Sequence, residues 1–158
     1  TNRDIVGVEL GGSLKNVIAI GVGMCDGVGF GDNTKSAIIT RGMTEIIRLG
    51  VAMGARKETF SGLSGIGDMI ATCLSKHSRN RYVGESLGRG KSLEEIMESM
   101  NMVAEGVETA KSIESLSLKY DIDMPISNAV CKILFESKDP KSMVVNLMTR
   151  HLGDELSN

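Results

Sequence analysis

The sequence has few aromatic, proline, cysteine and histidine residues. Phe, Tyr and Trp make up 3% of its 158 residues, so a core must be built from aliphatic side chains and the ten Met, which fill irregular gaps between helices. Only two Pro are present, which permits long helices. The three Cys lie far apart, which argues against a disulfide framework and favours a reducing, cytoplasmic compartment. Together with two His they form no close set of metal ligands, so no metal site is expected.

The sequence also lacks an excess of charge of one sign. Lys and Arg total 18 against 20 Asp and Glu, a net charge of -2, which argues against a nucleic-acid or membrane-surface binder. We see neither a signal peptide at Thr1 nor an apolar run long enough to span a bilayer, and we expect no membrane insertion. Because the first residue is not Met, we expect a processed product or an excised fragment. Its 158 residues suffice for one domain, residues 1–158.

Helical periodicity dominates the sequence, and no convincing alternation of period two is present. The pattern predicts an all-α domain of roughly seven to nine helices. Several of the 19 Gly fall inside helical patterns, where Gly costs about 1 kcal/mol relative to Ala, so close packing or space for a ligand should justify them. The predicted helices cover about 8–28, 32–54, 69–74, 78–90 and 106–120, with a shorter stretch around 58–63 after the second. Others start at Ser92, Pro125 and Pro140, and the last runs to about His151 before a frayed tail.

Lys15 is the first residue with a chemical interpretation. It falls in a strongly helical stretch beside Gly11, Gly12 and Ala19, and small neighbours leave room near its amine. A lysine amine that is shielded from water gives up its proton more readily and can then act as a base near neutral pH. From the spacing alone, a surface lysine beside tightly packed glycines is the more common alternative.

Two further motifs are rich in glycine or in basic residues. Residues 62–68, Gly-Leu-Ser-Gly-Ile-Gly-Asp, superficially resemble a nucleotide-binding loop, but they follow no clear strand, and we reject that interpretation. Asp68, at the end of this motif, is most simply a helix N-cap. Residues 76–81, Lys-His-Ser-Arg-Asn-Arg, lie at a predicted helix N-terminus, where their side chains and free backbone N–H groups suit a phosphate. A solvated basic turn and a nucleic-acid patch are the alternatives.

Glu105 and the two histidines give weaker signals. Glu105 precedes Gly106 and is suited to accept hydrogen bonds from a ribose or an amide. The alternative is a Glu that only favours the start of a helix. His77 and His151 are expected to face solvent rather than to act in catalysis.

Five segments together resemble one known family: residues 7–20, 27–33, 62–68, 78–81 and 103–107. The similarity is to the C-terminal domain of bacterial NAD(P)-dependent glycerol-3-phosphate dehydrogenases, and it covers nearly the whole chain. It implies an all-α, multi-helix domain of the 6-phosphogluconate dehydrogenase C-terminal-like type. It also implies an oxidoreductase that interconverts sn-glycerol 3-phosphate and dihydroxyacetone phosphate for phospholipid synthesis.

The resemblance also implies a role for each matching residue. Lys15 would be the general base that takes the proton of the C2 hydroxyl, and its ammonium would be the acid in the reverse direction. Asn16 and Asp68 would hold the substrate hydroxyls and orient Lys15. The other implied substrate contacts are Thr72, Ser78, Arg79 and Asn80, and the implied cofactor contacts are Arg79, Val103 and Glu105.

A strand followed by a glycine-rich turn and a helix, the mark of a dinucleotide-binding domain, is absent from the sequence. The resemblance places NAD or NADP mainly on an N-terminal Rossmann domain, so the chain alone is expected to have little or no dehydrogenase activity. The resemblance also allows a homodimer. Two alternatives are left open: a non-catalytic helical dimerisation or adaptor module, and the helical domain of a dehydrogenase that acts on another small substrate.

Overall fold

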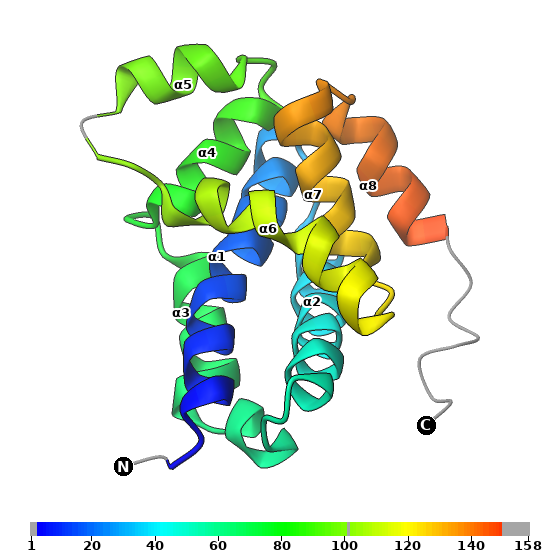
Figure 1. Cartoon of the computed structure of the whole chain (residues 1–158). Helices are drawn as coiled ribbons and strands as arrows, with labels where there is room; N and C mark the ends of the chain where they lie inside the picture. Colours follow the sequence, from blue (N-terminus) through cyan, green and yellow to red (C-terminus); the bar gives the residue numbers. More distant parts are fainter. Residues whose placement is uncertain (1–2, 101, 150–158) are drawn as a thin grey trace.

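A central helix, α1 (Ile5–Val28), organises the computed structural model, which describes residues 3–100 and 102–149 (Figure 1). The helix α2 (Asp32–Ala52) lies on one side of α1. On the other side lie α3 (Asp68–Leu74) and α4 (Arg79–Gly88).

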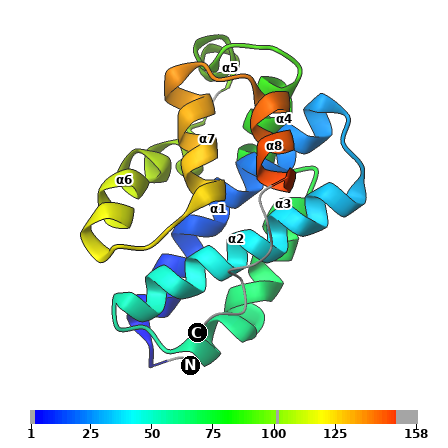
Figure 2. The same cartoon turned by 90° about the vertical axis from the view of Figure 1, so that its right-hand side faces the viewer.

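The second half of the chain closes around this centre. The helices α6, α7 and α8 each contact α1, while the short helix α5 extends from α4 at one end of the molecule (Figure 2). The described part of the chain contains no strand, so the predicted all-α class is confirmed. The bounds of these elements are α5 (Leu93–Ser99), α6 (Glu105–Tyr120), α7 (Pro125–Glu136) and α8 (Pro140–Thr149).

Most helix starts follow the predicted capping signals. Ser92 forms the predicted capping box at α5, and Pro125 and Pro140 are the first residues of α7 and α8. The backbone N–H at the third position of α8 donates to the side chain of Asp139 (2.8 Å), which is therefore a cap. The helix α1 starts earlier than predicted because the side chain of Asp4 caps it. The predicted end of the last helix at about His151, and the tail after it, lie outside the described residues.

The segment between α2 and α3, which the sequence marked only as a shorter stretch around residues 58–63, folds into two tight helical turns. It forms a 3-10 turn, η1 (Lys57–Ser61), and a π-helical turn, η2 (Leu63–Gly67), which leads directly into α3. A Cβ on Gly65 would lie 2.1 Å from the carbonyl oxygen of Phe60, so only glycine fits in this turn. Isolated π-turns occur often at functional sites, and this one places Asp68 at the first position of α3.

The helix α1 is long and apolar enough, by length and composition, to cross a membrane. The expectation that no such segment exists was therefore wrong. However, 56% of the most apolar window is buried inside the molecule, and α2, α3, α4, α6 and α7 all contact the helix. This hydropathy is explained by the central position of α1, where neighbouring helices cover it.

Glycines bring the backbones of α1 and α4 into direct contact. A Cβ on Gly23 would lie 2.1 Å from the carbonyl oxygen of Arg81, and one on Gly27 would lie 2.2 Å from that of Glu85. The two helices therefore run in the same direction, with no side chain between them at these points. Close packing, one of the two expected reasons for glycine inside a helix, explains both positions.

A buried carboxylate from α2 caps the start of α7. Glu45 is 3% exposed, and its oxygens accept hydrogen bonds from the backbone N–H groups of Ile126 (2.6 Å) and Ser127 (3.0 Å) and from the hydroxyl of Ser127 (2.7 Å). Because Pro125 has no N–H, these are the first donors of the helix. Burial raises the pKa of Glu45 to about 7, against the three hydrogen bonds that favour the charged form.

We expect Glu45→Gln to flatten the pH dependence of stability. The folded-state pKa of about 7 lies above the ordinary value of 4.5, so the stability contributed by this group is greatest below about pH 4.5 and is lost as the pH rises through 7. Between about pH 5 and pH 8, the original chain should lose about 2 kcal/mol more free energy of unfolding than the variant. Urea unfolding of both chains at the two pH values measures this difference, and equal losses would contradict the prediction.

Candidate functional site

A cleft of about 410 Å³ lies where α1, α3, α4 and the start of α6 meet. Six of the nine residues to which the resemblance assigns a catalytic, substrate-binding or cofactor-binding role line this cleft. Segments from four separate parts of the chain therefore contribute to one site. The lining residues are Asn16, Ala71, Thr72, Ser75, His77, Ser78, Arg79, Asn80 and Glu105.

Lys15 and Asp68 form an ion pair beside this cleft. The ammonium of Lys15 donates a hydrogen bond to Asp68 Oδ2, and the two side chains are 19% and 41% exposed, respectively. Lys15 precedes Asn16 on α1, and Asp68 lies one helical turn before Thr72 on α3, so the pair borders the lining residues. Lys15 is therefore partly buried rather than fully exposed at the surface. The interpretation of Asp68 as a simple N-cap was wrong, because Gly67 occupies the capping position of α3.

Glycines on α1 shape the surroundings of Lys15 in different ways. A Cβ on Gly11 would lie 3.6 Å from the ring of Phe60, which is ordinary packing contact, whereas one on Gly12 would meet nothing within 4 Å. Gly12 therefore leaves space next to Lys15, as expected from the sequence. Gly23, further along the helix, packs against α4 instead.

The first turn of α4 presents hydrogen-bond donors and a positive charge to the cleft. Ser78 is the N-cap, and its hydroxyl accepts the backbone N–H of Arg81 (3.2 Å). Arg79 and Asn80 are the next two residues, and both line the cleft. An exposed guanidinium at a helix N-terminus is suited to bind a dianion such as a phosphate group, because the helix dipole and the charge act together.

Two asparagines hold the start of α6 against α1 and α4. Asn80 Oδ1 accepts the backbone N–H of Gly106 (2.8 Å), and Asn16 Nδ2 donates to Glu105 Oε2 (3.4 Å) and to the carbonyl oxygen of Gly12 (3.3 Å). A Cβ on Gly106 would lie 2.7 Å from the backbone oxygen of Asn16, so the helix start is pressed directly onto α1. The position of Glu105 at the cleft follows from these contacts.

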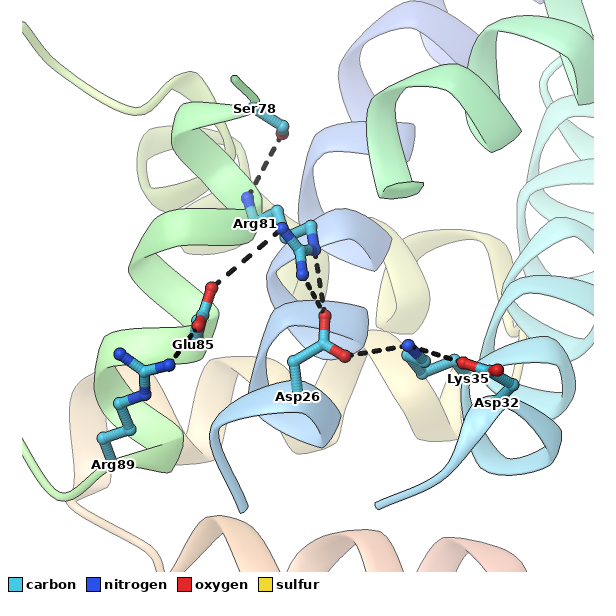
Figure 3. A network of polar contacts seen from close by, with 7 residues as sticks. All are labelled: Asp26, Asp32, Lys35, Ser78, Arg81, Glu85 and Arg89. Atoms are coloured by element: carbon cyan, nitrogen blue, oxygen red, sulfur yellow. Dashed lines mark hydrogen bonds and ion pairs between the residues drawn. The ribbon is translucent and has the colours of Figure 1, made fainter. Parts of the chain in front are cut away.

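Arg81 and Val103 are not among the residues that line the cleft. Arg81, the last member of the basic cluster, points to the other side of α4 and binds Asp26 through Nε (2.9 Å) and Nη2 (2.5 Å), as Figure 3 shows. It therefore does not belong to the phosphate-suited part of the cluster. Val103 is 54% exposed, on the segment that enters α6, and it does not line the cleft.

The structure also adds residues that the sequence motifs did not identify. Ala71 lines the cleft from α3, and so does Ser75, the residue that directly follows this helix. His77 is exposed to solvent, as expected, yet it is also part of the lining. No motif pointed to Ala71 or Ser75, whereas His77 lies within the basic motif at residues 76–81.

The arrangement is suited to proton transfer on a small anionic molecule. It combines an amine held by a carboxylate (Lys15 and Asp68), an anion-binding helix start that contains Arg79, and two amide side chains. Over residues 3–100 and 102–149, no group of His, Cys, Asp and Glu is arranged to hold a metal ion.

Known proteins share this sequence and this fold. The family model for the C-terminus of NAD-dependent glycerol-3-phosphate dehydrogenase matches residues 4–145. A curated relative from Salinibacter ruber, glycerol-3-phosphate dehydrogenase (NAD(P)+) 2, is 58% identical over 149 residues, which cover 94% of this chain and 43% of the relative. The corresponding enzyme of Chlorobium phaeobacteroides is 57% identical over 155 residues, which cover 98% of this chain and 46% of the relative.

A solved structure agrees with these relatives. The crystal structure of glycerol-3-phosphate dehydrogenase from Coxiella burnetii superposes with a TM-score of 0.91 at 41% identity, covering 94% of this chain and 46% of that chain. The predicted helical-domain type is therefore confirmed. The chain spans a little less than half the length of the proteins it matches. On the family match, the sequence identity and the shared fold, the chain belongs to the family described as NAD-dependent glycerol-3-phosphate dehydrogenase C-terminus.

Proposed function

We propose that the chain is the substrate-binding half of a cytoplasmic, NAD(P)-dependent dehydrogenase that interconverts sn-glycerol 3-phosphate and dihydroxyacetone phosphate for phospholipid synthesis. One observation supports this most: the Lys15–Asp68 pair borders the same cleft that Arg79 lines. A proton donor and a phosphate site are the two features this substrate requires. A helical dimerisation or adaptor module has no need of their convergence.

The proton transfer falls to Lys15. In the reductive direction its ammonium donates a proton to the C2 oxygen of dihydroxyacetone phosphate, and in the oxidative direction its amine takes the proton of the C2 hydroxyl. Asp68 accepts a hydrogen bond from Lys15 and thereby orients it. Asn16 and Thr72, which line the cleft next to this pair, are placed to hydrogen-bond the substrate oxygens.

The phosphate of the substrate binds at the first turn of α4. Arg79 supplies the guanidinium, and the backbone N–H groups of this turn and the Ser78 hydroxyl supply further donors. Asn80 lies beside them, with its carbonyl oxygen held by the backbone of α6.

The rim of the cleft fits the edge of a nicotinamide cofactor. NAD or NADP, when bound, accepts or supplies the hydride at C2. The Glu105 carboxylate and the Arg79 guanidinium, both in the lining, suit amide and hydroxyl groups of such a cofactor, and exposed Val103 suits an apolar contact with it. Most of the cofactor would lie on an N-terminal nucleotide-binding half, which we propose as the partner of this chain.

A chimera tests the proposal. In it, this chain replaces the matching 149-residue segment of the Salinibacter ruber relative. We expect the chimera to oxidise NADH or NADPH in the presence of dihydroxyacetone phosphate, and the isolated chain to show no turnover, because most of the cofactor site is missing from it. The absorbance of the reduced cofactor measures both rates.

Unphosphorylated dihydroxyacetone is the matched control substrate for the chimera. Its kcat/KM should be lower by about 100-fold or more, because the donors of the α4 turn then contribute nothing to transition-state binding. A folded chimera that is inactive with dihydroxyacetone phosphate would contradict the proposed function. Equal kcat/KM values for the two substrates would contradict the phosphate site.

A further inference from the structure

A network of charged side chains that the proposed mechanism does not use connects α1, α2 and α4 (Figure 3). Asp26, near the end of α1, binds Arg81 of α4 through Oδ2 and the ammonium of Lys35 of α2 through Oδ1 (2.9 Å). The three side chains are 16–18% exposed. One carboxylate therefore connects three helices, with each oxygen committed to one cation.

Arg79 and Arg81 lie on opposite sides of the first turn of α4. Two residues along an α-helix correspond to a rotation of about 200°, so a tether on Arg81 also fixes which way Arg79 points. Arg79 lines the cleft, while Arg81 is held on the other side by Asp26. The orientation of Arg79 thus depends on the contact between Arg81 and Asp26.

Asp26, which holds Arg81, and Lys15, the proposed proton donor, lie on the same helix. Asp26 and Lys15 both belong to α1, eleven residues or about 16 Å apart along the helix axis. The Asp26–Arg81 contact therefore sets the start of α4 relative to the helix that positions Lys15. Partial burial alone would raise the pKa of Asp26, but hydrogen bonds from Lys35 and Arg81 hold it below its ordinary value, so the carboxylate stays charged.

We propose that Asp26 is a positioning residue: by binding Arg81 it holds the first turn of α4 so that Arg79 faces the cleft and binds the substrate phosphate. This inference rests on the proposed function. Without Asp26, the acidic partner left to Arg81 among residues 3–100 and 102–149 is Glu85 at 4.0 Å, which belongs to α4 itself and cannot tether that helix to α1. Lys35 keeps its other partner, Asp32 (2.8 Å), so the disturbance is centred on α4.

The chimera with Asp26→Asn tests this role. We expect the KM for dihydroxyacetone phosphate to rise by about tenfold, as for a misplaced positioning group, while kcat changes by less than about twofold. Asp32→Asn is the matched control: the substitution is the same and removes another partner of Lys35, but Asp32 is 93% exposed and its ion pair with Lys35 lies within α2. Its KM should stay within about twofold of the parent value.

A double-mutant cycle separates positioning from a general structural effect. If Asp26 acts through Arg79, adding Asp26→Asn to an Arg79→Lys chimera should change the KM by less than about twofold, because the two effects are coupled. The same tenfold rise in both backgrounds would overturn the proposal, and so would an unchanged KM in the single variant. If the Asp26→Asn chimera does not fold, Arg81→Gln removes the same contact from the α4 side. The same changes in KM are then expected, and the same results would overturn the proposal.

Equilibrium binding of inorganic phosphate to the chimera tests the positioning role of Asp26 separately from the proposed dehydrogenase activity. Asp26→Asn should weaken phosphate binding by about tenfold as well. If the chimera binds phosphate in this Asp26-dependent manner but does not reduce dihydroxyacetone phosphate, the positioning role stands and the proposed function fails. Phosphate binding that is unaffected by both Asp26→Asn and Arg81→Gln overturns the positioning role.

Discussion

Replacing Lys15 by Ala should lower the kcat of the chimera with dihydroxyacetone phosphate by about 1,000-fold. A positioned general acid contributes on the order of 100- to 10,000-fold to a proton transfer, and no lysine is among the residues that line the cleft beside Lys15. The fold should survive, because Asp68 is 41% exposed and water can solvate it once its partner is gone. Initial rates and circular dichroism of the variant measure the two expectations.

Lys15→Arg distinguishes proton transfer from charge. An arginine keeps the positive charge next to Asp68 but does not release a proton near neutral pH, so this variant should be about as inactive as Lys15→Ala. Lys111→Ala is the matched control, because Lys111 is also a helical lysine in an ion pair, with Glu108 at 2.8 Å, but it is 55% exposed on α6. Retention of more than a tenth of the parent kcat in either Lys15 variant would contradict the role of general acid.

Local signals in the sequence predicted the helices well. The capping box at Ser92 and the prolines at the starts of α7 and α8 act within one helical turn, so they are visible in a short window. The 3-10 and π turns at residues 57–67 were not predicted, because they depend on packing around Phe60 rather than on an apolar period. Propensity carries little information about such turns.

The candidate site could be predicted from the sequence only in part. Family resemblance identified Lys15, Asp68 and Arg79, but no local rule pairs Lys15 with a residue 53 positions away. The same limit applies to the cap that Glu45 provides for α7, which joins residues 81 and 82 positions apart. Such partners are set by how helices pack, and the packing is a property of the whole fold.

Replacing Gly84 by Ala should have the largest effect on stability. A Cβ at this position of α4 would lie 1.9 Å from the carbonyl oxygen of Ile20 and 2.8 Å from the backbone nitrogen of Met24, both on α1. Backbone atoms inside a helix cannot move aside as a flexible side chain does, so α4 must shift away from α1. We expect a loss of about 3 kcal/mol in the free energy of unfolding and a Tm lower by roughly 10 °C.

Gly12→Ala is the control for Gly84→Ala, because a Cβ on Gly12 meets nothing within 4 Å. It should raise stability by up to about 1 kcal/mol through helix propensity. Thermal unfolding of the chain, followed by circular dichroism, measures both variants. The same shift of α4 would move Arg79 and Asn80, so in the chimera Gly84→Ala should also raise the KM for dihydroxyacetone phosphate. A Tm within about 2 °C of the original chain would show that the two backbones are not in contact at Gly84.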